Sequence, residues 1–190
     1  YLTDDNGNTL FGFNRINTSG DPLEILPFTV TDPTQSNILI TQANGNSNVS
    51  FKYIVFRGDL TINEFNTGSS TIVGQANAAG ATAVGAVLYS NTPAYGVSPP
   101  TIASFSSKGG TPVDGVVRNK PEISAPNGVN TSVYLGGPDL ETDNIPNFFG
   151  TSAAAPHAAA VAALIKSAKL KFEGSNSTPD EINNILKNTT

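Results

Sequence analysis

A hydroxyl pair, Thr151 and Ser152, stands directly after Gly150 and directly before a run of alanines. Residues 153–165 hold almost no polar atoms besides one imidazole, so they predict a helix that is apolar on every face and therefore buried. We expect Pro156 in its first turn, where a missing N–H costs no hydrogen bond. Ser152 would then stand at the buried N-terminus of a central helix, where free N–H groups and the helix dipole favour negative charge. That position suits a nucleophile whose reaction generates an oxyanion.

Hydroxyl residues that precede a helix more commonly serve as N-caps, and the two hydroxyls alone leave that interpretation open. The wider string 149–157 reads Phe-Gly-Thr-Ser-Ala-Ala-Ala-Pro-His. It resembles the active-site serine motif of the subtilisin-like serine proteases (subtilases), Gly-Thr-Ser-x-Ala-x-Pro-His, at every fixed position. The resemblance implies that Ser152 is the catalytic nucleophile.

Three further segments resemble subtilase motifs and occur in the family's order. Residues 83–88 match an Ala-Val-Gly-Ala strand, and residues 103–110 match an Ala-Ser-Phe-Ser-Ser-x-Gly segment. Residues 120–129 approximate Lys-Pro-Asp-Ile-x-Ala-Pro-Gly, with Glu122 in place of Asp and Asn127 inserted before the glycine. Together with the serine motif, they extend the resemblance over about residues 72–190.

Serine hydrolysis also needs an imidazole base, a carboxylate that orients it, and oxyanion donors. The chain has a single histidine, His157, on the same expected helix as Ser152. At about 100° per residue its ring points roughly 140° away from Ser152, so we interpret it as structural. The base is therefore expected from outside this chain.

The other family motifs of the active site are missing. No Asp-Ser/Thr-Gly or His-Gly-Thr segment occurs, nor the Ala-Ala-Gly-Asn setting of the oxyanion asparagine. Residues 77–80 have a similar composition in another order and are interpreted as the end of a helix. Four acidic residues are expected on solvated loops and not in a triad. They are Asp114, Glu122, Asp139 and Asp143.

Residues 1–67 predict a β-rich insert or module. An Asp-Asn-Gly-Asn turn at 5–8 indicates a hairpin between residues 1–3 and 9–13. Further strands are expected at 23–30, after a turn at 20–22, and at 37–41 and 50–56. Short strands at this spacing suggest a small β-sandwich or jelly roll, which loosely resembles the β modules of secreted subtilases.

The acidic and amide residues of 4–8 could also indicate calcium. An EF-hand loop counted from Asp4 would need Glu at its twelfth position, where Arg15 stands. We therefore favour the plain hairpin. No metal site and no cofactor are expected.

Residues 68–190 predict an α/β fold, which the resemblance implies is the C-terminal part of the subtilisin-like parallel-sheet, three-layer fold. Residues 72–79 indicate a short helix, and the continuous apolar run 83–88 indicates a strand buried on both faces. Near the end, Thr178-Pro179-Asp180-Glu181 is a capping box. The stripe that follows predicts an amphipathic helix on the core, with Ile182, Ile185 and Leu186 on its apolar side.

Composition limits the remaining function classes. The formal charge of −5 gives no electrostatic support for a nucleic-acid partner. No apolar run is long enough to span a bilayer, and the absence of cysteine excludes disulfides and thiolate metal sites. The chain holds no methionine and begins at Tyr1, so we expect a processed form or a cut piece.

The resulting prediction is a serine endopeptidase fragment that forms an acyl-enzyme on Ser152 and is inactive alone. Its expected partners are a protein or peptide substrate and the rest of the parent catalytic domain, with a homodimer through an exposed sheet edge also considered. The resemblance implies an extracellular or cell-surface location. Two alternatives stay open: a non-catalytic binding or structural module on the same scaffold, and a carbohydrate- or calcium-binding β domain with a degenerate tail.

Overall fold

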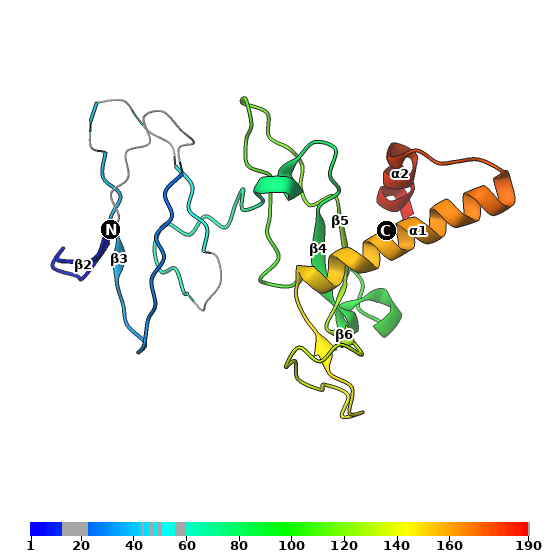
Figure 1. The fold of residues 1–190 in the computed structure, drawn as a ribbon, viewed down its shortest axis with the longest axis horizontal. Helices are drawn as coiled ribbons and strands as arrows, with labels where there is room; N and C mark the ends of the chain where they lie inside the picture. The colour runs from blue at the N-terminus through cyan, green and yellow to red at the C-terminus, as the bar shows by residue number, and fades with distance from the viewer. Residues whose placement is uncertain (13–22, 43, 46–47, 49–50, 56–59, 190) are drawn as a thin grey trace. The chain divides into compact units, whose positions relative to one another are not determined.

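A computed structural model describes residues 1–12, 23–42, 44–45, 48, 51–55 and 60–189. The chain divides into two compact units, Tyr1–Tyr53 and Ile54–Thr190, which are drawn in Figure 1. The boundary that the sequence predicts, between residues 67 and 68, stays a prediction. Each unit is described by itself.

The first unit contains one antiparallel sheet of short strands. Strands β1 (Leu2–Thr3), β2 (Thr9–Phe11) and β3 (Asn37–Ile38) lie in the order β2-β1-β3. The predicted hairpin at the N-terminus is confirmed, because β1 pairs antiparallel with β2.

The hairpin turn is held by the side chain of Asp4. Its Oδ1 accepts the N–H of Asn6 at 2.9 Å and that of Asn8 at 2.8 Å. The Asn8 side-chain amide also donates to Asp4 Oδ2 at 2.9 Å, and this bond, followed by the backbone bonds, lowers the pKa of the Asp4 carboxyl. Gly7 supplies the positive φ of 81° that the turn requires.

Two other strand predictions for the first 60 residues are wrong. Residues 23–30 and 51–55 form no strand, although their apolar residues alternate. Alternation describes which side chains share a face, and a ladder additionally needs a neighbouring strand, which the described residues do not supply for these segments. The predicted turn at 20–22 lies outside the described residues. One three-stranded sheet does not make a sandwich, so the jelly-roll-like insert is not confirmed.

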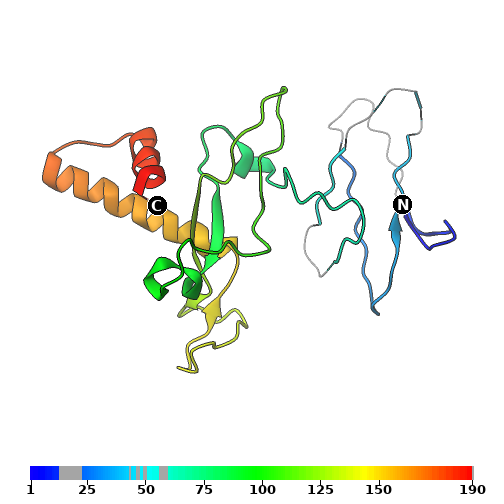
Figure 2. The ribbon, with the colours of Figure 1, turned by 180° about the vertical axis from the view of Figure 1, so that it is seen from behind.

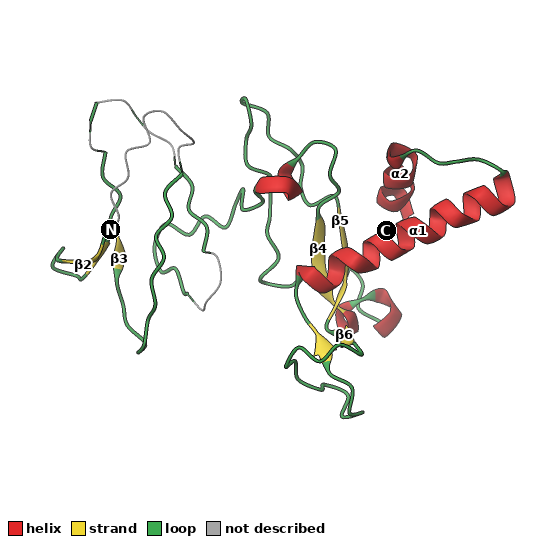
Figure 3. Cartoon of the chain, viewed as in Figure 1, coloured by secondary structure: helices red, strands yellow, loops and turns green. Residues whose placement is uncertain are grey.

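The second unit is built on a parallel strand pair, β4 (Val84–Leu88) and β5 (Ile123–Asn127). Their register runs from Val84 opposite Ile123 to Leu88 opposite Asn127. Helix α1 (Thr151–Glu173) packs on both strands, and Figure 3 shows this helix beside the pair. The predicted α/β class with a parallel sheet is therefore confirmed, and the three-layer arrangement stays a prediction.

Short 3-10 helices occur in the connections. The helix predicted at 72–79 is one 3-10 turn, η1 (Gly74–Asn77). Two more, η2 (Tyr89–Asn91) and η3 (Pro93–Tyr95), follow β4. A second hairpin, β6 (Val129–Asn130) with β7 (Asn147–Phe148), joins β5 to α1.

Small residues form much of the core between the strands and α1. Ala86 on β4 and Ala154 on α1 are both completely buried, which lets the two backbones approach closely. The remaining core residues are Ile123, Ala125, Ala158 and Leu186.

The expectation that the serine helix is buried all round is wrong for the described residues. On its other faces Val161 is 46% exposed and Leu164 is 68% exposed. The reason is that, among the described elements, β4, β5 and the second helix make the main contacts with α1 and leave its other faces largely uncovered. An apolar sequence predicts burial only where elements exist to cover every face.

The last helix, α2 (Pro179–Thr189), turns back to lie beside α1, as Figure 2 also shows from behind. Its predicted capping box is confirmed: Glu181 Oε2 accepts the N–H of Thr178 at 2.8 Å, and Thr178 Oγ1 accepts the N–H of Glu181 at 3.3 Å. Leu186 on its apolar side is buried. No helix in the described part of the chain has the length and apolar character to cross a membrane.

Candidate active site

Ser152 lies in the first turn of α1, and its side chain is exposed. The N-cap is Gly150, with φ 106° and ψ 170°, and no side chain caps the helix. The carbonyl of Gly150 instead accepts the N–H groups of Ala153 at 3.0 Å and Ala154 at 3.3 Å. The capping interpretation of the hydroxyl pair is therefore wrong, and the hydroxyl of Ser152 is exposed, not buried as the sequence indicates.

Pro156 lies inside α1, not in its first turn. Because proline has no N–H, the carbonyl of Ser152, four residues earlier, lacks its usual helical partner at this position. The backbone of the nucleophile candidate is thus less constrained by the helix than its neighbours.

The one imidazole of the chain is held by the same helix. His157 Nδ1 lies 2.7 Å from the carbonyl oxygen of Ala153. Since that oxygen only accepts, Nδ1 is the donor and carries a proton. The structural interpretation of His157 from the sequence agrees with this contact, which engages its ring with the backbone.

The acidic residues are divided between loops and a buried pair. Asp114 and Asp143 are exposed, and Asp139 accepts backbone N–H groups of its own loop. Glu122 was expected on a solvated loop, and this is wrong. It pairs with Lys120, whose side chain is only 2% exposed, and accepts the N–H of Ala83 at 2.8 Å.

The fold brings the four sequence motifs together. The segment after residue 100 supplies Ser106, whose Oγ accepts the N–H of Ala86 on β4 at 2.9 Å. Beside it, a Cβ on Gly85 would lie 3.0 Å from Ile102 and 3.2 Å from Ser106 Oγ, so a larger residue at this position would require these side chains to shift. The third motif forms β5, and the fourth begins α1.

The hairpin before α1 is stabilised by the buried side chain of Asn147. Its Nδ2 lies 2.9 Å from the carbonyl of Gly128 and 2.7 Å from Glu141 Oε2, and its Oδ1 accepts the N–H of Leu140 at 2.7 Å. Hydrogen bonds from Tyr89 and Asn147 lower the pKa of the Glu141 carboxyl. The same contact with Glu141 raises the pKa of Tyr89 to about 12.

Asn127 is a residue whose role the sequence does not reveal. Its side chain is 1% exposed, and its Oδ1 accepts the N–H of Gly150 at 3.4 Å. The available signal was that Asn127 interrupts the Ala-Pro-Gly pattern of the third motif.

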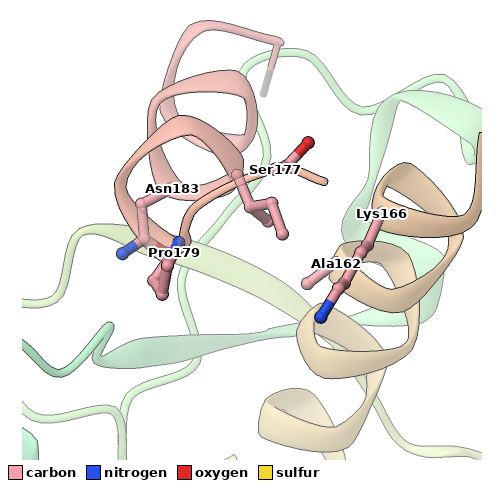
Figure 4. Close-up of a pocket in the computed structure, with 6 residues that line it drawn as sticks. Ala162, Lys166, Ser177, Pro179 and Asn183 are labelled. Atoms are coloured by element: carbon pink, nitrogen blue, oxygen red, sulfur yellow. The ribbon is translucent and has the colours of Figure 1, made fainter. Parts of the chain in front are cut away.

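Two shallow hollows flank α1. One, of about 300 Å³, lies between β6, β7 and the first turns of α1 and is lined by Phe148, Pro156 and His157 among others. The other, of about 260 Å³, lies between α1 and α2, where the polar ends of Lys166, Ser177 and Asn183 point in different directions (Figure 4). Within the described ranges, no group of three or more His, Asp or Glu side chains is placed to hold a metal ion.

The sequence model of the subtilase family matches residues 14–190, and the chain therefore belongs to the subtilase family. The chain is also 41% identical over 88 residues to bacillopeptidase F of Bacillus subtilis (strain 168). The match covers 46% of this chain and 5% of that relative, so the chain spans a small part of the relative's length. No solved structure matches the chain.

Proposed function

We propose that this chain is the C-terminal part of a serine endopeptidase catalytic domain and that Ser152 is its nucleophile. Ser152 Oγ attacks the carbonyl carbon of a peptide bond, and its proton passes to an imidazole from another part of the protease. That imidazole then protonates the departing amine, leaving an acyl-enzyme ester that water hydrolyses. The backbone N–H of Ser152 donates to the oxyanion.

The observation that carries this proposal is the position of Ser152 at the start of α1. Its side chain is exposed, it lies in the segment whose sequence resembles the serine motif of the family, and no side-chain hydrogen bond from the described residues caps the helix there. A hydroxyl in this position is accessible to a substrate and lies next to the positive end of the helix dipole.

Three observations support a base outside this chain. The chain has one histidine, and its Nδ1 is engaged with Ala153. The apolar residues Val161 and Leu164 of α1 are exposed, as expected of a helix that further elements cover. The matched relative is also far longer than the region it shares with this chain. We therefore expect the isolated chain to be inactive.

The family membership also supports a protein or peptide substrate and an extracellular or cell-surface location as parts of this proposal. Substrate and the remaining catalytic domain are the proposed partners. We also propose a homodimer that forms through the edges of the β4–β5 pair. Size-exclusion chromatography with light scattering tests this, and a strictly monomeric chain would exclude the dimer.

The decisive experiment treats the chain with a fluorophosphonate and reads the intact mass, with Ser152→Ala as control. Without additions we expect no adduct, because nothing activates the hydroxyl. High concentrations of imidazole supply a base from solution, and we then expect a slow adduct that depends on Ser152. An adduct that forms without imidazole would contradict the proposal that the base lies outside this chain.

No adduct under either condition would contradict the nucleophile assignment itself. That outcome would favour the alternative of a binding or structural module on a subtilase scaffold.

A further inference from the structure

Two segments run antiparallel to each other between β5 and the start of α1. Strands β6 and β7 pair Asn130 with Asn147 and Val129 with Phe148. One step nearer to α1, the N–H of Gly128 donates to the carbonyl of Phe148 at 2.9 Å. The backbone pairing ends at this point.

The next link toward Ser152 is formed by a side chain. Asn127 is the last residue of β5, and its Oδ1 accepts the N–H of Gly150 at 3.4 Å. The carbonyl of Gly150 in turn accepts two N–H groups at the start of α1. Both sides of the Gly150 residue are thereby held, the N–H by Asn127 and the carbonyl by the helix.

The identity of the Asn127 atom that faces Gly150 follows from chemistry. A backbone N–H needs an acceptor, so the amide must present its oxygen and not its nitrogen. The Nδ2 group is then left buried without a hydrogen-bond partner among the residues that the structure describes. An unpaired buried donor costs stability, which is difficult to account for if the residue serves the core alone.

The backbone geometry at Gly128 explains why residue 127 lies opposite Gly150. Gly128 adopts φ 75°, and a Cβ there would lie 2.6 Å from Leu88 and 3.0 Å from Phe149. The chain after β5 must therefore turn tightly against Phe149, which brings residue 127 opposite Gly150. From there the side-chain acceptor of Asn127 reaches the Gly150 N–H.

We propose that Asn127 is a positioning residue for the nucleophile, acting through Gly150 to fix the turn that carries Ser152. The functional meaning of this inference rests on the proposed role of Ser152. The hydrogen bond of Asn127 is to the backbone of Gly150, two residues before Ser152. It restricts the residue whose φ of 106° sets the direction in which α1 begins.

The test compares three variants of the whole chain. Asn127→Ala removes the acceptor, and Asn127→Asp keeps an oxygen acceptor while removing the unpaired donor. Asn77→Ala is the matched control, because Asn77 is also buried, also has one unpaired side-chain atom, and bonds to the distant Thr111 carbonyl.

The first readout is amide hydrogen exchange at Gly150, expressed as a protection factor. We expect protection to fall about fivefold to tenfold in Asn127→Ala, beyond any fall shared by the rest of α1. Asn127→Asp should largely restore it, because its carboxyl keeps an oxygen acceptor for the Gly150 N–H whether or not it is protonated. In Asn77→Ala, the protection factor of the Gly150 amide should change no more than those of the amides in the rest of α1. The second readout is the imidazole-dependent labelling rate at Ser152, which should follow the same order.

Equal effects of Asn127→Ala and Asn77→Ala at Gly150 would overturn the inference, as would unchanged protection in Asn127→Ala. If Asn127→Ala does not fold, Asn127→Leu decides, because leucine keeps a similar side-chain volume without an acceptor, and unchanged Gly150 protection in that variant overturns the inference. Exchange does not require a reactive serine. If Ser152 is never labelled, the proposed function is contradicted. The protection of the Gly150 amide still tests the role of Asn127 in that case.

Discussion

The ring of His157 donates from Nδ1 to the carbonyl of Ala153, one helical turn earlier and directly after Ser152. Between them, Pro156 removes the N–H that would otherwise bond to the Ser152 carbonyl. A proline and a histidine therefore alter the hydrogen bonding of two successive carbonyls near the start of α1. In this arrangement the Nδ1 atom of the His157 ring is engaged by the backbone of its own helix.

Replacing His157 should accordingly affect stability and not the chemistry of Ser152. We expect His157→Leu to lower the free energy of unfolding by about 1 kcal/mol, because the ring hydrogen bond to Ala153 is lost. His157→Asn should lose less, since its amide N–H can reach the same carbonyl. Urea denaturation measures both variants.

The imidazole-dependent labelling of Ser152 is the second readout for these His157 variants. It should continue in the folded fraction of His157→Leu. Complete loss of labelling in a folded variant would show that His157 takes part in the reaction.

The packing of α1 on β4 gives a second prediction. Ala154 is completely buried against a core that includes Ala86, whereas Ala159 of the same helix is exposed. We expect Ala154→Leu to destabilise the chain by about 1–3 kcal/mol, because the larger side chain separates helix and strand. Ala159→Leu is the control and should change the unfolding midpoint little. Similar unfolding midpoints for the two variants would contradict the placement of Ala154 on the buried face of α1 and of Ala159 on an exposed face.

A third prediction concerns the start of α2. Thr178→Ala removes the oxygen that accepts the N–H of Glu181 and should cost about 1 kcal/mol of unfolding free energy. Ser175→Ala, just before the capping box, provides a control outside the motif. If both variants melt at the temperature of the unmodified chain, the capping box does not contribute to stability.

Local features of the fold could be predicted because their causes are local. The hairpin depends on Asp4 and on the residues up to Asn8, and the capping box depends on Thr178 and Glu181. The run 83–88 predicts a buried strand because its apolar character is continuous. In each case the sequence contains the interacting groups within a few positions.

Features that depend on distant partners could not be predicted in this way. Residues 23–30 alternate like a strand, but no alternation specifies which strand will pair with them. The exposure of Leu164 depends on which elements cover α1. Glu122 accepts the N–H of Ala83, 39 positions earlier, and Asn127 accepts the N–H of Gly150, 23 positions later along the chain.

The contact between Tyr89 and Glu141 gives a prediction about pH. The pKa of Tyr89 is raised to about 12 by its hydrogen bond to Glu141, so the folded chain retains this proton better than the unfolded chain does. The resulting stability is fully present below the ordinary tyrosine pKa of about 10 and is lost as the pH rises toward 12. Conversely, the lowered pKa of Glu141 contributes stability above its ordinary value, which is lost as the pH falls through the folded value.

Spectroscopic titration of tyrosinate, as a difference between the unmodified chain and Tyr89→Phe, isolates the ionisation of Tyr89. We expect its midpoint near pH 12 in the unmodified chain and nearer to 10 in Glu141→Gln, because the neutral amide no longer opposes formation of the phenolate. Glu24→Gln removes a carboxylate from the other unit and should leave the midpoint unchanged. A Tyr89 midpoint that does not respond to Glu141→Gln would mean that the two side chains do not interact in solution.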